Sequence, residues 1–507
     1  MENVVIIDCG SQFTQLIARR VRELKAHSTV LPWDVSVERV QKQNPAALII
    51  SGGPESVNDP DAIVLAEGLW ELDVPILGIC YGMQLMARTL GGQVVSGERP
   101  EYGLTEVHRK GSSRLLEGFP EEGEVLMSHR DRVAQVPDGF RVTAETAHGV
   151  VAAMEDDAGR RFGLQFHPAL AETGQDLLLS RFLFDICGCK GDWKLDGWVS
   201  TAVEKIRAKV GPGRVVCGLS GGVDSSVAAA LVHKAIGSQL ECIFVDHGLM
   251  RMNEARHVLD SYAGLGLSVR HVDASELFLS RLAGVTDPEK KRRIVGQLFI
   301  EVFDAEAAKI GSVDWLLQGT IYPDVIESGS KKGSALVKSH HNVGGLPEHM
   351  KLKLLEPLRD LFKDEVRELG RLIGVPDAIV NRQPFPGPGL AVRCLGEITR
   401  ERLDTLRAAD AIFREELTRA GLYDKIWQSF CVLLPVRTVG VMEEGRTYSE
   451  VLALRAVNSQ DAMTAEWVPL PSSLLEVTAK RICSEVPGIN RVVLDVTSKP
   501  PATIEWE

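Results

Sequence analysis

Short apolar runs rich in β-branched residues alternate with amphipathic helical patterns along most of the chain. Such runs predict buried strands at Val4–Asp8, Ala47–Ser51, Val74–Ile79, Val215–Leu219, Cys242–Asp246 and Trp315–Gln318. Strands that alternate with helices are typical of parallel sheets whose faces are covered by helices. The runs form two groups, so we expect an α/β protein with two parallel-sheet blocks.

Two stretches interrupt this alternation and predict domain boundaries. Cys187–Trp193 is glycine-rich and follows a helical pattern at Asp176–Ile186. Arg382–Leu390 contains three prolines in five residues, which neither a helix interior nor a central strand tolerates. Beyond it we expect a small α+β block with a helix at Arg400–Ala420, strands near Val432–Val441, a helix near Ser472–Val486 and a strand at Arg491–Val496. The predicted domains are residues 1–190, 191–382 and 383–507.

The composition of the 507-residue chain narrows the function classes. No run approaches the roughly 18 apolar residues of a membrane helix, and the start MENVVIIDCG lacks the basic region of a secretory signal. The formal net charge of −12 argues against bulk nucleic-acid binding. Nine scattered cysteines without a CxxC pair predict free thiols in a reducing compartment. We therefore expect a cytoplasmic protein with no nucleic-acid or membrane partner.

A cysteine stands at a predicted strand-to-helix turn. In Gly78-Ile79-Cys80-Tyr81-Gly82 the two glycines permit a tight turn that holds the Cys80 side chain out in strained geometry. The helix that follows directs its N-terminal amides at the sulfur, so we expect a lowered thiol pKa and a reactive thiolate. The G-x-C-x-G pattern alone is equally consistent with a buried core cysteine.

Two further motifs favour the catalytic interpretation of this cysteine. A thiolate that attacks an amide needs a proton shuttle and an oxyanion hole. His167 in GLQFHP (163–168) is the candidate shuttle, and SGGP (51–54) offers backbone amides after a predicted strand. By itself His167 would more often be a structural histidine. The order of SGGP, GICYG and QFHP along the chain favours catalysis.

A glycine- and serine-rich loop follows the predicted strand Val215–Leu219 and opens a helix. Its backbone amides and the helix dipole make an anion site for phosphates, and the glycines allow close approach. The expected ATP-binding residues of this loop are Ser220, Gly221, Gly222, Val223, Asp224, Ser225 and Ser226. Asp224 is also a candidate Mg²⁺ ligand. The Walker A pattern is absent, and a bare SGG would be an ordinary turn, but SGGVDSS after a buried strand is far more specific.

Three later segments add to this nucleotide site. Val245 ends the next predicted strand, where an adenosine would sit beside the loop. Asp324 and Glu327 are candidate Mg²⁺ ligands or acid–base groups, although a solvated acidic loop is the plainer interpretation. Gly329–Pro347 has many glycines and resembles a lid whose basic groups could neutralise phosphate, although by itself it would be an exposed loop. Its basic groups are Lys331, Lys332, Lys338, His340 and His341.

Residues 1–190 resemble a class I glutamine amidotransferase domain. The matching motifs are SGGP (51–54), GICYGMQ (78–84), MSHRD (127–131) and GLQFHP (163–168). The resemblance implies that Cys80 forms a glutamyl thioester while His167 moves the protons. It also implies an oxyanion hole at Gly52, Gly53 and Tyr81, and glutamine contacts from Gln84, Ser128 and His129.

The chain departs from that family at the third triad position. The family's His-Pro-Glu is His167-Pro168-Ala169 here, so the carboxylate that orients the histidine is missing. Arg130 stands where the family usually has glycine. Neutralising the carboxylate of a serine triad costs about 10⁴ in rate, and a Cys–His pair should depend on it less. We expect impaired glutamine use with intact ammonia use, unless another carboxylate such as Glu172 substitutes.

Residues 191–382 resemble the N-type ATP pyrophosphatases, which adenylate an oxygen and release pyrophosphate. NAD synthetases, argininosuccinate synthetases, tRNA-modifying thiolases and GMP synthetases share this loop. Five longer motifs resemble GMP synthetases in particular, and with the amidotransferase part they cover nearly the whole chain. They are YPDVIES (322–328), KSHHNVGGLP (338–347), RQPFPGPGLAVR (382–393), LLPVRTVGVM (433–442) and INRVVLDVTSKPPATIEWE (489–507).

The GMP synthetase resemblance implies a carbon–nitrogen ligase of purine biosynthesis. XMP would be adenylated by ATP with Mg²⁺, and ammonia from glutamine would displace AMP to give GMP. The resemblance implies XMP contacts at Arg292, Lys499 and Glu505, an ATP contact at Lys363, and a homodimer formed through residues 383–507. A tRNA thiolase is the main alternative, but the second half lacks paired cysteines and the chain is acidic. A non-enzymatic regulator is a second alternative, which Ala169 favours slightly and SGGVDSS opposes.

Overall fold

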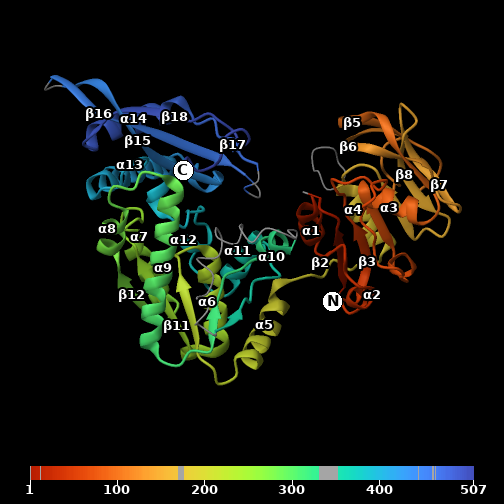
Figure 1. The fold of residues 1–507 in the computed structure, drawn as a ribbon, viewed down its shortest axis with the longest axis horizontal. Coiled ribbons are helices and arrows are strands. Elements are labelled where there is room, and N and C mark those ends of the chain that lie inside the picture. The colour runs from red at the N-terminus through yellow and green to blue at the C-terminus, as the bar shows by residue number, and fades with distance from the viewer. Residues whose placement is uncertain are drawn as a thin grey trace. The chain divides into compact units, whose positions relative to one another are not determined.

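The computed structural model describes residues 2–11, 13–168, 176–329, 352–442, 445–459, 462 and 464–507 (Figure 1). The chain folds as two compact units. The first comprises Met1–Lys194 with the described part of Pro323–Gly333, and the second comprises Leu195–Tyr322 with the described part of Ser334–Glu507. Among the described residues, no helix is long and apolar enough to cross a membrane.

The first unit contains a mixed sheet whose strand order is β2-β1-β3-β4-β9-β8-β7-β5-β6. Its strands are β1 (Asn3–Asp8), β2 (His27–Pro32), β3 (Pro45–Ile50), β4 (Ile76–Ile79), β5 (Gln93–Arg109), β6 (Glu122–Gln135), β7 (Phe140–Thr146), β8 (Val151–Asp156) and β9 (Arg161–Leu164). Its helices are α1 (Thr14–Glu23), α2 (Val37–Gln41), α3 (Tyr81–Thr89) and α4 (Asp176–Arg181), which a π-helical turn at Phe182–Ile186 continues.

Only half of this sheet matches the parallel sheet that the sequence predicts. Strands β2, β1, β3, β4 and β9 are parallel, and β1 and β3 read as apolar runs because both of their faces are buried. Strands β8, β7, β5 and β6 extend the sheet in antiparallel pairs. In β6, buried and exposed positions alternate along the strand, which is typical of a sheet with one wet face.

The second unit begins with an entirely parallel sheet of order β12-β11-β10-β13-β14. Its strands are β10 (Val215–Leu219), β11 (Leu240–Asp246), β12 (Val269–Asp273), β13 (Trp315–Leu317) and β14 (Lys353–Leu355). The helices around it are α5 (Leu195–Val210), α6 (Val223–Ile236), α7 (Glu254–Gly264), α8 (Ser275–Leu282), α9 (Pro288–Ile310), α11 (Lys363–Leu372) and α12 (Asp377–Val380). Helix α10 (Tyr322–Gly329) lies at the junction between the two units' sequences.

A smaller, mostly antiparallel sheet completes the second unit. It contains β15 (Gln428–Met442), β16 (Gly445–Asn458) and β17 (Glu466–Trp467), and β18 (Ile489–Leu494) pairs with β16 in parallel. Helices α13 (Arg400–Arg419) and α14 (Ser472–Glu485) accompany it. One hydrophobic core joins Val216 of the parallel sheet to Leu452 of the small sheet. The predicted α/β architecture with a small α+β part is confirmed, whereas the domain limits at 190 and 382 stay predictions.

Candidate active sites

The predicted elbow forms between β4 and α3. Cys80 has φ 49° and ψ −108°, a strained conformation for a residue with a side chain. A Cβ at Gly82 would lie 2.2 Å from the Ile50 carbonyl oxygen, and one at Gly78 would lie 2.6 Å from the Gly82 carbonyl oxygen. Both glycines are therefore required by close backbone approach, and the turn they permit holds Cys80 at the start of α3.

Cys80 and His167 meet although 87 positions separate them in the sequence. Cys80 Sγ lies 3.4 Å from His167 Nε2, and the thiol donates to the Gln165 carbonyl oxygen at 3.0 Å. The Phe13 ring packs on the imidazole with the ring centroids 4.4 Å apart. The strands β4 and β9 are parallel neighbours, and this pairing brings the residues after their carboxyl ends together. The pair has the geometry of a nucleophile and its base.

Burial sets the charge state of this pair. It raises the pKa of the Cys80 thiol and lowers the pKa of His167 to about 4. The expected lowering of the thiol pKa was therefore wrong, because enclosing the sulfur disfavours its charged form. Near neutral pH the pair is a neutral thiol beside a neutral imidazole. Such a pair can act when the imidazole accepts the thiol proton as sulfur attacks.

The second nitrogen of the histidine bears on the missing triad carboxylate. Among the described residues, His167 Nδ1 is buried and has no hydrogen-bond partner. Ala169 and Glu172, on which the sequence argument depends, lie outside the described residues. His167 can therefore act as the base for Cys80, but no hydrogen-bond acceptor among the described residues orients its ring through Nδ1.

The SGGP segment lies against the same pair. A Cβ at Gly52 would meet both Cys80 Cβ and His167 Cε1 at 3.5 Å. A Cβ at Gly53 would lie 2.6 Å from the Cys9 carbonyl oxygen and 3.3 Å from the Tyr81 ring. Gly52 thus lies beside the Cys80–His167 pair, and Gly53 packs against Tyr81 at the start of α3.

The expected glutamine contacts are separated by strand geometry. Ser128 and His129 are consecutive on β6, so their side chains point to opposite faces; Ser128 is exposed and His129 is buried. Gln84 Nε2 donates to the Asp131 carbonyl oxygen at 2.8 Å, and that oxygen lies 3.1 Å from His129 Nδ1. His129 Nε2 lies 3.1 Å from a carboxylate oxygen of Glu101, a residue that the sequence reasoning missed.

The predicted phosphate loop connects β10 to α6 as expected. Gly221 has a φ of 72°, and Ser220 Oγ lies 3.1 Å from Ser225 Oγ on one side of the loop. Ser226 differs from the expectation of a phosphate donor. It is fully buried, and its hydroxyl donates to the Gly222 carbonyl oxygen at 2.7 Å and lies 2.8 Å from the Tyr262 hydroxyl.

Two charged groups flank the loop. Lys363 at the start of α11 donates to one carboxylate oxygen of Asp224. The other oxygen, Asp224 Oδ1, is buried without a hydrogen-bond partner in the described part of the chain. A hard carboxylate oxygen of this kind fits Mg²⁺. The structure thus brings Asp224 and Lys363 together, as the separate sequence expectations for them require.

The other expected nucleotide residues are less informative. Val245 is buried in β11, so its side chain belongs to the core. Asp324 is half-buried in the first turn of α10. This segment is therefore a helix, whereas the plainer interpretation of the sequence was a solvated acidic loop. The Glu327 side chain and the predicted lid, with Lys331, Lys332, Lys338, His340 and His341, lie outside the described residues.

Arg292, Lys499 and Glu505, the three residues expected to contact XMP, each form a hydrogen bond with another part of the chain. Arg393, fully buried, donates from Nε and Nη2 to the two carboxylate oxygens of Glu505 at 3.0 and 2.8 Å. Lys499 Nζ donates to the Ala462 carbonyl oxygen at 2.8 Å, and Arg292 donates to the Glu507 carbonyl oxygen. Within the described ranges, no hydrogen bond or ion pair joins Arg292, Lys499 and Glu505 to one another. Arg393 ends the quoted RQPFPGPGLAVR motif, which is the signal that could have identified it.

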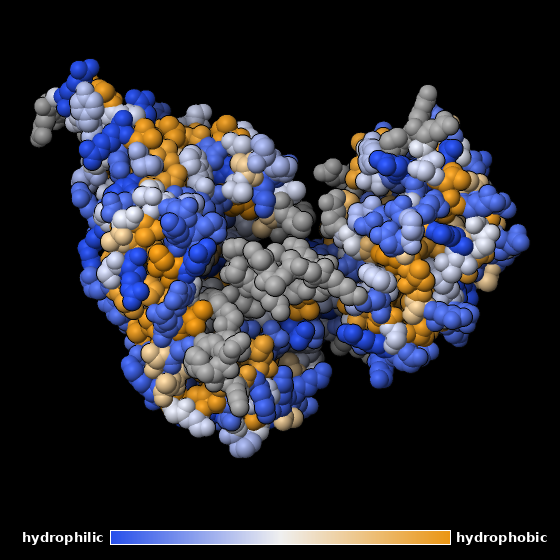
Figure 2. All heavy atoms as spheres, in the orientation of Figure 1, coloured by the Kyte–Doolittle hydropathy of each residue, from blue (hydrophilic) through white to orange (hydrophobic). Residues whose placement is uncertain are grey.

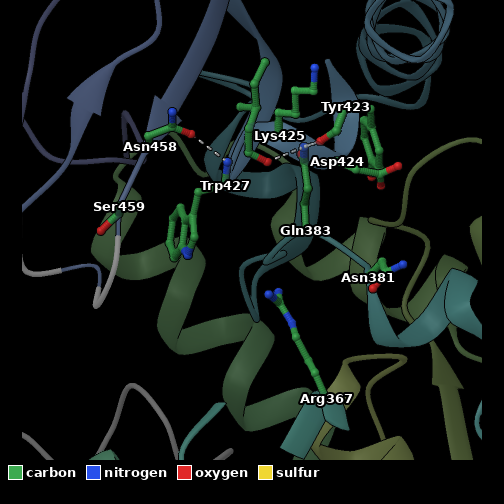
Figure 3. Close-up of a pocket in the computed structure, with 10 residues that line it drawn as sticks. Arg367, Asn381, Gln383, Tyr423, Asp424, Lys425, Trp427, Asn458 and Ser459 are labelled. Carbon is green, nitrogen blue, oxygen red and sulfur yellow. Dashed lines mark hydrogen bonds between the residues drawn. The ribbon is translucent and has the colours of Figure 1, made fainter. Parts of the chain in front are cut away.

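A polar cavity of about 260 Å³ opens in the second unit (Figure 3). Arg367 of α11 and Trp427, beside β15, reach into it from opposite sides, whereas the ammonium of Lys425, another lining residue, points away from them. Burial lowers the pKa of Arg367, and the negative charge of Asp224 offsets part of this shift. The side chain that reaches into the cavity therefore interacts electrostatically with a residue of the phosphate loop. Its volume is below the roughly 300 Å³ of the smallest typical ligand sites, so it suits a phosphate or one ring.

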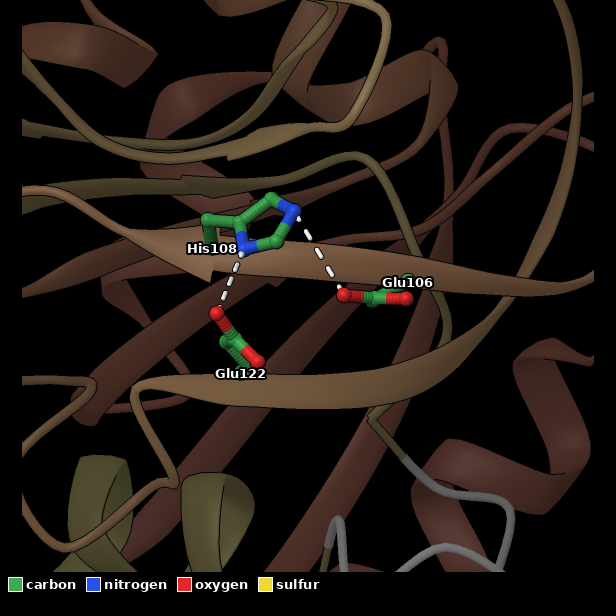
Figure 4. A group of neighbouring side chains, drawn as sticks. All are labelled: Glu106, His108 and Glu122. Atoms are coloured by element: carbon green, nitrogen blue, oxygen red, sulfur yellow. Dashed lines mark ion pairs between the residues drawn. The ribbon is translucent and has the colours of Figure 1, made fainter.

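One cluster in the first unit has metal-ligating residue types (Figure 4). His108 of β5 lies between Glu106 at 3.6 Å and Glu122 at 3.7 Å. Both glutamate side chains are more than half exposed. Exposed carboxylates of this kind pair with a histidine without any ion, so we assign the cluster no metal.

The comparisons with known proteins cover the whole chain. The family model "Glutamine amidotransferase class-I" matches residues 5–186, "NAD synthase" matches residues 194–291, and "GMP synthase C terminal domain" matches residues 415–506. A protein of Symbiobacterium thermophilum named "GMP synthase [glutamine-hydrolyzing]" is 55% identical, over 99% of this chain and 99% of its own. Proteins of the same name from Bradyrhizobium and Azoarcus are each 54% identical over 100% of this chain, and over 96% and 99% of their own.

Proposed function

The chain belongs to the family of glutamine-hydrolysing GMP synthases, and from this premise we propose that it aminates XMP to GMP, using ATP and ammonia released from glutamine. It is a carbon–nitrogen ligase of purine nucleotide biosynthesis with glutamine as nitrogen donor. The structural observation that best supports this function is the distance of 3.4 Å between Cys80 Sγ and His167 Nε2. The same chain also has an intact SGGVDSS loop.

Ammonia is released in the first unit. His167 Nε2 accepts the thiol proton of Cys80 as Sγ attacks the side-chain amide carbon of glutamine. Backbone amides near Gly53 and Tyr81 stabilise the developing oxyanion. The imidazolium then protonates the leaving nitrogen, ammonia departs and a glutamyl thioester remains. Water, deprotonated by the neutral imidazole, attacks the thioester and releases glutamate with the thiol restored.

ATP is used in the second unit. The backbone amides of the glycine loop and the hydroxyls of Ser220 and Ser225 bind the β- and γ-phosphates, and Lys363 adds a cation beside them. An XMP oxygen attacks the α-phosphorus, pyrophosphate leaves, and ammonia later displaces AMP from the adenylated purine to give GMP. Asp224 Oδ1 would hold Mg²⁺, which supplies positive charge to the pyrophosphate leaving group.

Glutamine use is expected to be the weaker half of this chemistry. The chain has Ala169 where the family has glutamate, and His167 Nδ1 has no partner among the described residues. Without a carboxylate the imidazolium is less stable and the ring is less firmly oriented. We propose that ammonia-driven synthesis exceeds glutamine-driven synthesis unless Glu172 substitutes.

The chain also carries features that support a homodimer formed by residues 383–507. Large apolar side chains are exposed along the small sheet, among them Val441 at 84%, Tyr448 at 63% and Val439 at 41%. Figure 2 shows orange, hydrophobic atoms gathered over the C-terminal sheet and α14. A contiguous exposed apolar surface marks an interface.

We expect three domains, at residues 1–190, 191–382 and 383–507, and we expect the protein to be located in the cytoplasm.

One experiment tests the proposal. The protein is mixed with ATP, Mg²⁺ and either glutamine or an ammonium salt, with and without XMP, and GMP, AMP and pyrophosphate are measured. A GMP synthase forms AMP only with XMP, whereas a tRNA thiolase or a non-enzymatic regulator does not respond to XMP. Cys80→Ser should abolish the glutamine arm and spare the ammonium arm. Absence of AMP with XMP and ammonium would refute the assignment.

A further inference from the structure

The glycine loop after β10 is held from outside by an arginine that the reaction above does not use. Arg382, two residues after the end of α12, donates from Nη1 to the Gly221 carbonyl oxygen and from Nη2 to Glu254. The Arg382 side chain is 12% exposed and the Glu254 side chain 9%, so the pair is largely shielded from water. A charge-assisted contact in such surroundings is strong and directional.

The Gly221 carbonyl sets the direction of a backbone donor. In a trans peptide the C=O of one residue and the N–H of the next point in opposite directions. With its carbonyl turned to Arg382, Gly221 therefore leaves the Gly222 N–H facing the other way, where it donates to Ser220 Oγ at 3.3 Å. The Ser225 hydroxyl lies on that side too, 3.1 Å from Ser220 Oγ. This is the side proposed to receive the phosphates.

Glycine by itself does not select this orientation. Gly221 has a φ of 72°, and glycine populates positive and negative φ about equally. A Cβ at Gly221 would lie 2.6 Å from Arg382 Nη1 and 3.1 Å from Val258 Cγ2. The absence of a side chain thus admits the guanidinium to the carbonyl, and the guanidinium in turn holds a peptide that glycine would leave free to rotate.

The rest of the cluster keeps Arg382 in place. Glu254 also accepts from the Arg251 backbone N–H at 2.9 Å. Burial by itself would raise the pKa of Glu254, but Arg382 and Arg251 lower it below the usual value, so the carboxylate stays charged. The guanidinium carbons of Arg382, Arg251 and Arg393 lie 6.0, 4.7 and 5.2 Å from the centre of the Phe385 ring.

We propose that Arg382 is a positioning residue for the ATP pyrophosphatase step, which fixes the Gly221–Gly222 peptide so that its N–H faces the pyrophosphate. The proposal rests on the proposed function of this loop. Arg382 acts through the backbone and does not touch ATP. Its loss lowers the fraction of loops that are competent to bind, and the apparent affinity for ATP falls by that fraction.

Arg382→Gln is expected to lower kcat/KM for ATP by about 10- to 100-fold, the effect of removing a hydrogen bond to a charged group. The KM for XMP and the release of glutamate from glutamine should stay at the parent's values, because neither depends on the loop. Calorimetric titration with inorganic pyrophosphate alone should show the same loss of affinity. Arg256→Gln is the matched control, an arginine of α7 whose side chain is 85% exposed.

Because Arg382→Gln leaves Glu254 buried without its partner, two more variants separate positioning from folding. The double variant Arg382→Gln, Glu254→Gln removes both charges. Arg382→Lys keeps the positive charge but lacks the two guanidinium nitrogens that donate to Gly221 and Glu254 together. Both should melt near the parent's temperature and still bind pyrophosphate less tightly. Parent-like ATP and pyrophosphate affinity in both, or an equal loss for ATP and XMP, would overturn the proposal. A parent protein that forms no AMP with XMP would instead refute the proposed function.

Discussion

Restoring a carboxylate at the third triad position is expected to raise glutamine-driven synthesis and to leave ammonia-driven synthesis unchanged. The perturbation is Ala169→Glu, two residues after His167. His167 faces Cys80 Sγ through Nε2 at 3.4 Å, and its buried Nδ1 has no partner among the described residues. A carboxylate that accepts from Nδ1 stabilises the imidazolium that forms when the thiol loses its proton.

The size of the effect follows from the charge state of the pair. Burial lowers the pKa of His167 to about 4 and raises the pKa of the Cys80 thiol, so both burial effects oppose the ion pair. A neighbouring opposite charge shifts a pKa by about 1–3 units, and each unit is about 1.4 kcal/mol or tenfold in the ion-pair population. We therefore expect a gain of about 10- to 1,000-fold in kcat/KM for glutamine, below the roughly 10⁴ that the carboxylate contributes in a serine triad.

The assay compares two nitrogen sources in one preparation. Initial rates of GMP formation are measured at saturating ATP and XMP with glutamine or with an ammonium salt, and the ratio of the two rates cancels differences in active fraction. Ala169→Gln is the control, because it has the shape of glutamate without the charge. An equal gain from Ala169→Gln would refute the electrostatic reasoning. The reasoning would also be refuted if the parent protein already used glutamine as efficiently as an enzyme with a complete triad.

Three further outcomes are expected from the described contacts. Gly82→Ala places a Cβ 2.2 Å from the Ile50 carbonyl oxygen, so the elbow must open; glutamine-driven rates should fall by roughly 100-fold, the cost of an ångström-scale misplacement, while ammonia-driven rates persist. His27 has its pKa lowered from 6.5 to about 3 by burial and by Arg22, so it contributes stability above pH 6.5 that is lost as pH falls toward 3. Denaturant unfolding should show a loss of about 2 kcal/mol between pH 7.5 and 5 that His27→Gln removes; a pH dependence unchanged in the variant would contradict the assignment. Ser226→Ala should lower the melting temperature and leave the KM for ATP unchanged, because its hydroxyl bonds the chain; a raised KM would make it a phosphate ligand after all.

The local strand-to-helix geometry of both candidate sites was readable from the sequence. An apolar run, a glycine pair and a helical pattern are neighbours along the chain, so they predict the Cys80 elbow and the loop at Gly221 without reference to the rest of the fold. Alternation of strands and helices likewise predicts parallel sheets, because each crossover needs a helix. The antiparallel strand β6 was missed, since a strand with one wet face lacks the continuous apolar run that marks a buried one. Strand β8, which is buried along nearly its whole length, was missed as well.

Tertiary structure alone decided which side chains are enclosed and what they face. Burial reversed the expected pKa shift of Cys80, and it turned Ser226 from an expected phosphate donor into a partner of Tyr262. The fold also brought Arg382 to Gly221 across 161 positions and Arg393 to Glu505 across 112. Desolvation and long-range pairing depend on residues distant in sequence, and no local pattern encodes which of them will meet.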